Sequence, residues 1–521
     1  MPENRATPWR DDTAAPVTIG EGRLDLAELV AYARGQRALR LDDAAAFRER
    51  IAAGAAALDR NIAAGQVVYG VTTGYGDNCE VAIPPDSLDS LPIHLTRYHG
   101  CGLGHELPTM AVRAVLAARL NSLARGYSGV RFALLQQLAG LIEHDLLPRI
   151  PEEGSVGASG DLTPLSYVAA VLAGEREVYR EGQLLDAVVA LRAVGMNPLR
   201  LARKEAIAVM NGTAVMTGLA CLAWDRAQYL VRLAARITAL ASAALHGRRG
   251  HFSPRLFAAK PHAGQNAVAA WIYADLAPRE DDALRVQDRY SIRCAPHVIG
   301  VLADALSWIG RDLENELNSA NDNPLIDPDT AEVLHGGHFY GGHVGFAMDA
   351  LKTAVASVAD LLDRQMALLV DPRYNNGLAQ NLSAAPPEQA ALHHGFKAVQ
   401  IATSAWTAEA LKLTMPASSF SRSTECHNQD KVSMGTIAAR DALRVLELAE
   451  QVAAALLLAC RQAIALRERV QPDELSRLAD PAREFVAGLA RTFPLLEADR
   501  ALEPDLRQML AAIQAQQWVW N

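Results

Sequence analysis

Residues 154–175 read GSVGASGDLTPLSYVAAVLAGE, and the character of the sequence changes halfway through this stretch. Three glycines in the first half permit a tight turn, because glycine adopts backbone angles that other residues avoid. Thr163 followed by Pro164 is typical of a helix start with threonine as the N-cap, and the apolar residues that follow predict a helix through Ala173. The expected local structure is a glycine-rich turn that leads into a helix.

Besides a purely structural turn, three chemical uses of this stretch are open. A phosphate-binding loop needs lysine or bare amides at the helix start, whereas Asp161 lies there and would repel an anion. A hydrolase serine needs Gly-x-Ser-x-Gly after a strand, but Asp161 replaces the last glycine and residues 147–153 are a poor strand sequence. In the third use, the Gly160 nitrogen attacks the Ala158 carbonyl. Loss of water, including the Ser159 hydroxyl, then leaves an exocyclic methylene on an imidazolone ring. Composition and spacing do not establish this cyclisation.

Outside the turn, the sequence predicts a mainly helical protein. Hydrophobic residues make up 50% of the chain and aromatics only 6%, and alanine, leucine and charged residues recur at helical spacing. Long helices that are apolar on several faces are typical of the centre of a bundle or of a subunit interface. We therefore expect a loop-rich N-terminal domain over residues 1–212 and a long central helix bundle over residues 213–521. The long helices are expected at about 213–246, 296–319, 342–371 and 432–468.

Composition and charge exclude several classes of partner. The net charge of −9 argues against a nucleic-acid-binding surface, which needs a basic face. The N-terminal residues lack the apolar core of a signal peptide, and the uncharged run 206–224 is typical of a buried helix rather than a membrane span. Six scattered cysteines indicate reduced thiols. We expect a cytoplasmic protein without a nucleic-acid or membrane partner, and without a metal site, because His335, His338 and His343 lack ligand spacing.

The stretch 154–175 closely resembles the signature of the histidine, phenylalanine and tyrosine ammonia-lyases and related aminomutases. In that family an Ala-Ser-Gly triplet becomes 4-methylidene-imidazol-5-one (MIO), so the resemblance implies that Ala158, Ser159 and Gly160 form this electrophile. It also implies a fold of the aspartase and ammonia-lyase type. The resemblance runs from Tyr69 to the end of the last predicted long helix. Further matching motifs are YGVTTGYG at 69–76, RYHG at 97–100, KE at 204–205 with NGT at 211–213, VQDRYSIRC at 286–294, NDNP at 321–324, GGHF at 336–339 and ECHNQD at 425–430.

The resemblance implies roles for side chains that, taken singly, would more often be structural. Tyr69 would be the catalytic base, and Tyr290 would donate to the amine or relay a proton. Arg293 would bind the substrate carboxylate through its planar fork. As a base near pH 7, Tyr69 needs its pKa lowered by about three units, or roughly 4 kcal/mol, and we expect helix ends and a nearby arginine to do this. The implied substrate-binding residues are His99, Asn211, Gln287, Phe339, Glu425, Asn428 and Gln429.

Substrate choice depends mainly on His99 and Gln429. In the family, histidine at position 99 suits a ring with a polar atom, a phenol or an imidazole. Histidine-selective members usually carry glutamate where this chain has Gln429, and a neutral amide pairs less well with a cationic ring. We expect elimination of ammonia from tyrosine or a substituted phenylalanine to the trans-unsaturated acid, with histidine second. Tyr98 is bulkier than usual, and His338 replaces a common asparagine, which predicts differences around the ring pocket.

Two alternatives share these motifs. A tyrosine 2,3-aminomutase would return the amine to give a β-amino acid, and the sequence does not decide between the two outcomes. A helical scaffold without activity would be expected to lose Ser159, Tyr69 or Arg293, yet all three are present. The resemblance also implies a homotetramer whose active sites are shared between subunits and take a small amino acid.

Overall fold

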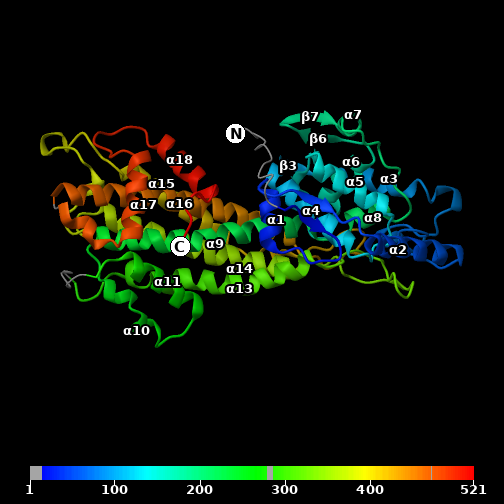
Figure 1. Cartoon of the computed structure of the whole chain (residues 1–521), viewed down its shortest axis with the longest axis horizontal. Coiled ribbons are helices and arrows are strands. Elements are labelled where there is room, and N and C mark those ends of the chain that lie inside the picture. Colours follow the sequence, from blue (N-terminus) through cyan, green and yellow to red (C-terminus); the bar gives the residue numbers. More distant parts are fainter. Residues whose placement is uncertain (1–14, 279–284, 471, 521) are drawn as a thin grey trace. The chain divides into compact units, whose positions relative to one another are not determined.

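The computed structural model describes residues 15–278, 285–470 and 472–520. The chain forms two compact units, and each is assembled from three separate segments. Both units consist mainly of helices (Figure 1), which confirms the predicted class. Unit 1 comprises Met1–Ala223, Gly310–Asp349 and Pro416–Arg440, and unit 2 comprises Trp224–Ile309, Ala350–Met415 and Asp441–Asn521.

All four predicted long helices are present: α9 (Ala214–Ala244), α13 (Ala295–Leu317), α14 (Gly342–Val370) and α16 (Gly435–Val470). The start of α16 differs most from the prediction. Met434 has a φ of 59°, a left-handed conformation that a right-handed helix cannot include, so α16 begins after it. Residues 452–460 of α16 are all buried, as expected for a helix at the centre of a bundle.

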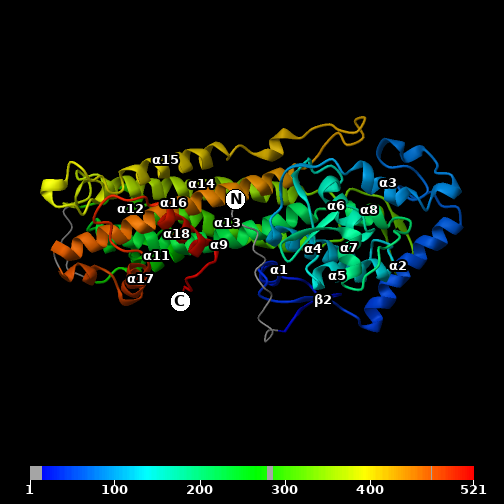
Figure 2. The same ribbon diagram turned by 90° about the horizontal axis from the view of Figure 1, so that it is seen from above.

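In unit 2 the four long helices run side by side (Figures 1 and 2) and are joined by polar contacts. Trp224 of α9 donates to the Leu306 carbonyl of α13 at 2.9 Å. Gln365 of α14 donates to Thr238 of α9 at 3.0 Å. These contacts fix which faces of the helices meet. The remaining α-helices of unit 2 are α10 (Pro254–Phe257), α11 (Ala263–Asp275), α12 (Tyr290–Arg293), α15 (Lys397–Lys412), α17 (Asp480–Thr492) and α18 (Glu503–Gln514).

Unit 1 combines shorter helices with small sheets. Its helix α6 packs against α3 and α8, and α4 packs against α1, α5 and α8. The helices are α1 (Leu26–Ala33), α2 (Ala45–Ala63), α3 (Leu91–Tyr98), α4 (Thr109–Ala124), α5 (Phe132–Glu143), α6 (Leu162–Leu172), α7 (Ala187–Ala193) and α8 (Glu205–Met210). The strands are β1 (Val17–Ile19), β2 (Leu39–Leu41), β3 (Leu103–Glu106), β4 (Leu147–Pro148), β5 (Pro151–Glu153), β6 (Glu177–Arg180), β7 (Gln183–Asp186), β8 (Leu325–Ile326) and β9 (Val333–Leu334).

Two local predictions for unit 1 were wrong. Residues 147–148 and 151–153 do form short strands. β4 pairs with β6 at the edge of the β4-β6-β7 sheet, where the missing amide of Pro148 is tolerated, and β5 pairs with β3. The N-cap of α6 is Asp161 rather than Thr163, although Pro164 does lie in the first turn. The Asp161 carboxylate makes no hydrogen bond to its own helix.

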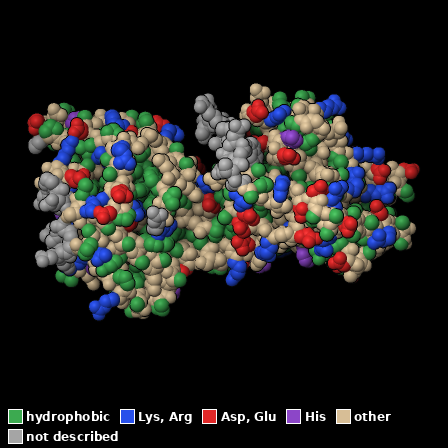
Figure 3. All heavy atoms as spheres, in the orientation of Figure 1, with side chains coloured by type: hydrophobic (Ala, Val, Ile, Leu, Met, Phe, Trp, Pro, Cys, Tyr) green, Lys and Arg blue, Asp and Glu red, His purple; other side chains and the backbone are tan. Residues whose placement is uncertain are grey.

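On the surface, basic and acidic side chains are intermingled on the face shown in Figure 3. Within the described ranges, Tyr290–Leu317 is the one helical segment that is long and apolar enough to cross a membrane. Length and composition alone carry this result, and the core helix of a soluble protein passes the same test.

Candidate active site

The turn at 157–160 adopts a backbone conformation that favours glycine. Gly157, Ser159 and Gly160 have φ values of 79°, 49° and 80°. At position 160 there is also no space for a side chain, since a Cβ atom there would lie 2.2 Å from the Gly212 carbonyl oxygen. Glycine is therefore required at this position both by conformation and by close approach.

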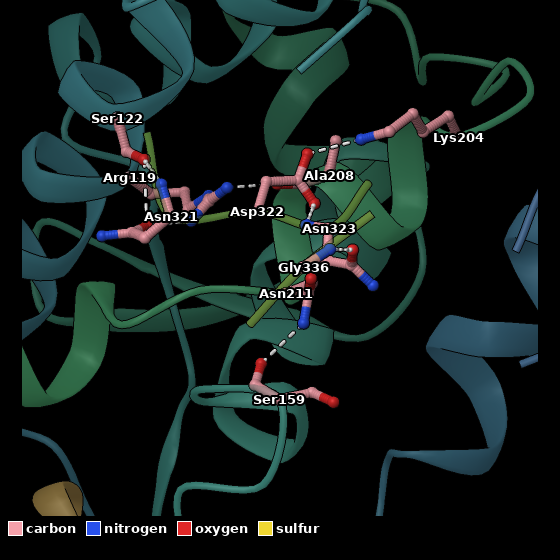
Figure 4. A network of polar contacts seen from close by, with 10 residues as sticks. All are labelled: Arg119, Ser122, Ser159, Lys204, Ala208, Asn211, Asn321, Asp322, Asn323 and Gly336. Atoms are coloured by element: carbon pink, nitrogen blue, oxygen red, sulfur yellow. Dashed lines mark hydrogen bonds and ion pairs between the residues drawn. The ribbon is translucent and has the colours of Figure 1, made fainter. Parts of the chain in front are cut away.

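Two segments distant in sequence hold the turn. The Asn211 side chain points toward it (Figure 4), and its Nδ2 donates to the Ser159 carbonyl oxygen at 2.8 Å. The Asp161 amide donates to the Gly212 carbonyl at 2.8 Å. From the other segment, Gln429 Nε2 donates to Ser159 Oγ at 3.3 Å. The turn is thus fixed both at its carbonyl and at its hydroxyl.

Asp161 connects the turn to the start of α9. Its carboxylate is buried and accepts hydrogen bonds from the amides of Val215 and Met216, at 3.0 and 2.9 Å. It also accepts from the hydroxyls of Ser155 and Thr436. Burial raises the pKa of Asp161 to about 6, and these hydrogen bonds act in the opposite direction. Asp161 therefore caps the N-terminus of α9 rather than that of its own helix, α6.

The turn opens onto a cavity of about 820 Å³ in unit 1. Tyrosines, amides and loop glycines line much of it, together with residues from the motifs singled out in the sequence. The predicted site residues that line it are Tyr69, His99, Ala158, Ser159, Asn211, Phe339, Glu425, Asn428 and Gln429. Gly160 lies in the same turn.

The other three predicted site residues belong to unit 2. Tyr290 and Arg293 are on α12, and Gln287 precedes it. The Arg293 guanidinium lies 4.8 Å from the centre of the Tyr290 ring, and its Nε donates to the Asp288 carbonyl at 3.0 Å. The parts of these three residues in the reaction remain predictions.

Tyr69 is held by its hydroxyl and by its backbone. The Gly76 amide donates to its hydroxyl oxygen at 2.8 Å, and its own amide donates to His335 Nε2 at 3.3 Å. Burial raises the pKa of Tyr69, the hydrogen bond from Gly76 lowers it, and Glu425 and Cys79 raise it further. The net direction is upward, so the expected lowering by helix ends and an arginine is not found in this structure.

His99 presents a defined nitrogen for hydrogen bonding. Its Nδ1 lies 3.1 Å from the Leu95 carbonyl oxygen, and because a carbonyl only accepts, Nδ1 must carry the proton. Burial lowers the pKa of His99, which keeps the ring neutral near pH 7. The remaining Nε2 is therefore a hydrogen-bond acceptor. The centres of the Tyr98 and His99 rings are 4.4 Å apart.

The loop 424–430 also lines the cavity. Gln429 Oε1 accepts from the Thr424 hydroxyl at 3.0 Å, which orients the amide so that Nε2 faces Ser159. Both Glu425 oxygens accept from the Asp77 amide at 3.0 Å, which ties this loop to the Tyr69 loop. Glu425, Cys426 and His427 have φ values of 51°, 53° and 65°. Such a run of left-handed residues is strained and is typical of functional loops.

Two residues at the site, Tyr75 and Arg119, were not predicted from the sequence. Tyr75, inside the motif at 69–76, lines the cavity, and membership of that motif could have identified it. Arg119 is on α4, in a stretch without any motif signal, and it contacts Gly212, the neighbour of Asn211. Among the described residues there is no group of three or more His, Cys, Asp or Glu side chains that could hold a metal ion.

The chain matches the family model described as aromatic amino acid lyase over residues 24–489. It is 38% identical over 495 residues to the histidine ammonia-lyase of Gloeobacter violaceus, covering 94% of this chain and 93% of that relative. The fold is similar to that of tyrosine aminomutase from Streptomyces globisporus, with a TM-score of 0.88, 32% identity and coverage of 96% and 97%. Histidine ammonia-lyase from Trypanosoma cruzi gives a TM-score of 0.87, 31% identity and coverage of 96% and 94%. The ammonia-lyase fold expected from the sequence is thereby confirmed, and the chain belongs to the aromatic amino acid lyase family of carbon–nitrogen lyases.

Proposed function

We propose that this protein eliminates ammonia from an aromatic L-amino acid whose ring carries a hydrogen-bond donor, with tyrosine as the first choice. The product would be the trans-unsaturated acid. The observation that carries the proposal is that His99, whose Nε2 is left as a hydrogen-bond acceptor, lines the same cavity as Ala158 and Ser159. We also propose that the enzyme acts in the cytoplasm as a homotetramer with shared active sites.

The residues of the turn fit a MIO group formed from Ala158, Ser159 and Gly160. Position 160 has no space for a side chain, and the flanking glycine at 157 lets the chain bend sharply. Asn211 Nδ2 would donate to the carbonyl oxygen that Ser159 contributes to the group. The Oδ1 atom of the same Asn211 side chain is buried without a hydrogen-bond partner. When formed, the group supplies an electrophilic carbon for the substrate amine.

The other side chains are proposed to bind and deprotonate the substrate. Tyr69, as the phenolate, would take the β-hydrogen. Arg293 would bind the carboxylate with both arms of its guanidinium. Tyr290 would donate a hydrogen bond to the substrate amine or relay a proton, and Glu425 would bind the amine. Phe339 would line the MIO group. Gln287 and Asn428 would orient the substrate carboxylate and the turn.

The ring end of the cavity favours a phenol. A tyrosine hydroxyl can donate to His99 Nε2, whereas phenylalanine would leave that acceptor without a partner, which costs binding energy. The Gln429 side chain is a neutral amide, and its Oε1 accepts from the Thr424 hydroxyl. A neutral amide offers no negative charge to an imidazolium ring.

Histidine is the second candidate substrate, and its support comes from sequence relatives. Curated relatives at 35–38% identity are histidine ammonia-lyases, and a neutral imidazole N–H could also donate to His99. A third outcome, 2,3-amino migration, is supported by the similarity to the tyrosine aminomutase of Streptomyces globisporus.

Product analysis tests these proposals directly. The purified protein is incubated with L-tyrosine, L-histidine or L-phenylalanine, and the products are separated. We expect coumarate from tyrosine at the highest kcat/KM. Urocanate as the main product would identify histidine as the substrate instead, and β-tyrosine would identify an aminomutase.

A further inference from the structure

A fully buried arginine lies behind the turn. Arg119 of α4 is 0% exposed, and its Nη2 donates to the Ala208 carbonyl of α8 at 2.5 Å. Its Nη1 donates to Asn321 Oδ1 at 3.0 Å, while its Nε is buried without a partner. Figure 4 shows the guanidinium beside Asn321. Each of its hydrogen-bond partners is a neutral oxygen.

The charge of this arginine is not met by a carboxylate at contact distance. The adjacent buried Lys204 is paired with Asp322 at 2.5 Å, and both side chains are 0% exposed. Within the described part of the chain, no carboxylate oxygen lies within 4.0 Å of the Arg119 guanidinium. Burial opposes the charge and lowers the pKa of Arg119 to about 10, whereas Asp322 and Asp161 favour the charge from beyond contact distance. A buried charge without a carboxylate in contact is costly, so an apolar side chain would be the cheaper filling for this position. The position therefore calls for a function that uses the charge.

The guanidinium touches the segment that holds the turn. A Cβ atom on Gly212 would lie 2.0 Å from Arg119 Nη1, so the two are in contact. Gly212 accepts from the Asp161 amide, and the preceding Asn211 donates to the Ser159 carbonyl oxygen. The 211–212 segment thus contacts both Arg119 and the turn.

We propose that Arg119 is a positioning residue for formation of the electrophile. Its guanidinium holds Asn211 and Gly212 against residues 159–161, and its positive charge strengthens the hydrogen bond from Asn211 to the Ser159 carbonyl. This inference rests on the proposed function, because it concerns cyclisation of the same turn.

The chemistry of cyclisation explains why charge would matter. A bond forms between Gly160 N and Ala158 C, and the Ala158 oxygen leaves as water with the amide hydrogens of Gly160 and Ser159. The Ser159 hydroxyl leaves as a second water with the Ser159 α-hydrogen. As that α-hydrogen is removed, negative charge builds on the Ser159 carbonyl oxygen. Asn211 contacts this atom, and preorganised positive charge there lowers the barrier.

The test compares substitutions of two buried arginines on the same helix. Arg113 is six residues before Arg119, about 9 Å along the helix axis, and pairs with Asp145 at 2.7 Å. Arg119→Met, Arg119→Lys and Arg113→Met are purified, and the folded fraction is isolated by size exclusion. Intact mass gives the fraction of chains that have lost two waters, thermal unfolding gives stability, and steady-state kinetics give kcat and KM.

We expect both methionine variants to unfold at lower temperature, but only Arg119→Met to accumulate full-mass chain. Its kcat should fall by about 10- to 100-fold, as is usual for residues that support a reactive group from behind, with KM nearly unchanged. For Arg119→Lys, the fraction of full-mass chain and kcat should lie between the values for Arg119→Met and for the wild type.

A folded Arg119→Met protein with the complete mass loss and wild-type kcat would overturn the inference. If Arg119→Met gives no folded fraction, Arg119→Lys decides by the same criterion: incomplete mass loss or lowered kcat supports the role, and wild-type values overturn it. A wild-type protein at full mass would instead overturn the proposed function.

Discussion

At the scale of single residues, Tyr69 shares the cavity with a carboxylate that opposes its ionisation. The carboxylate of Glu425 is among the groups that raise the pKa of Tyr69. Since the base must be ionised to act, kcat/KM should rise about tenfold per pH unit below this pKa. In Glu425→Gln the opposing charge is gone, so the pKa falls and the acidic limb of the pH profile moves to lower pH. A limb at the same pH in both proteins would contradict this coupling.

Formation of the electrophile and its use depend on different residues. Ser159→Ala removes the hydroxyl that must leave, so the protein should show its full sequence mass and no activity. Tyr69→Phe leaves the turn unchanged and should keep the loss of two waters, while kcat falls by about 10²- to 10⁴-fold, the usual loss for a general base. Intact mass and steady-state kinetics on both variants check this separation. Full mass in Tyr69→Phe would place Tyr69 in maturation instead.

Ring selection is expected to depend on one nitrogen atom. His99→Leu removes the acceptor Nε2 and leaves an apolar contact. The ratio of kcat/KM for tyrosine to that for phenylalanine should fall by at least about tenfold, the equivalent of one hydrogen bond. Rates with the two substrates on wild type and variant measure this. An unchanged ratio would mean that the ring lies elsewhere in the cavity.

The sequence predicted much of this residue-level arrangement, but not its details. Motifs identified Ser159, Asn211 and Gln429, which the structure brings together. The tautomer of His99 depends on a backbone carbonyl four residues earlier, and it becomes known only once α3 is built. The contact of Arg119 with Gly212 joins two segments with no pattern in common, so periodicity could not reveal it.

At the scale of elements, Asp161 links the turn to the first amides of α9. Its folded pKa of about 6 lies above the value of 3.8 expected for an unfolded chain. Its contribution to stability is therefore fully present below pH 3.8 and is lost as pH rises through about 6, at about 1.4 kcal/mol per unit. Asp161→Asn does not titrate, so its unfolding temperature relative to wild type should rise between about pH 4 and pH 7. Parallel curves would show that Asp161 does not carry this dependence.

Helix positions followed from apolar periodicity because long buried helices have a strong and redundant pattern. Their ends did not, since an end is decided by single backbone conformations such as the left-handed Met434 before α16. The strands β4 and β5 were missed because they are only two and three residues long and contain prolines. Such short strands are defined by their pairing partners, which a local pattern cannot show.

At the scale of the whole molecule, the proposed residues are divided between two units. Tyr69 belongs to unit 1 and Arg293 to unit 2. Each unit is built from three chain segments, whereas the boundary predicted from the sequence divides the chain once, near residue 212. Contacts between distant segments create this arrangement, and a composition pattern read along the chain does not contain them.

Subunit mixing tests the shared sites. Tyr69→Phe and Arg293→Ala should each be inactive alone. If one site draws these two residues from different chains of a symmetric tetramer, co-assembly at equal amounts should restore about a quarter of the wild-type activity. Activity of the mixture after co-refolding, with size-exclusion mass as a check on assembly, measures this. No recovery would mean that both residues act within one chain.

Residues 429–436 contact the turn, so these contacts can form only after this late segment of the chain has been synthesised. Asp161 and Thr436, which share a hydrogen bond, are 275 residues apart. At roughly 5–20 residues per second, a ribosome needs about 14 to 55 s to synthesise that stretch. Until then the nascent chain has Ser159 but lacks the segment that contacts its hydroxyl. Maturation of the turn is therefore a late event, and a chain cut short before Thr436 would carry an unprocessed serine.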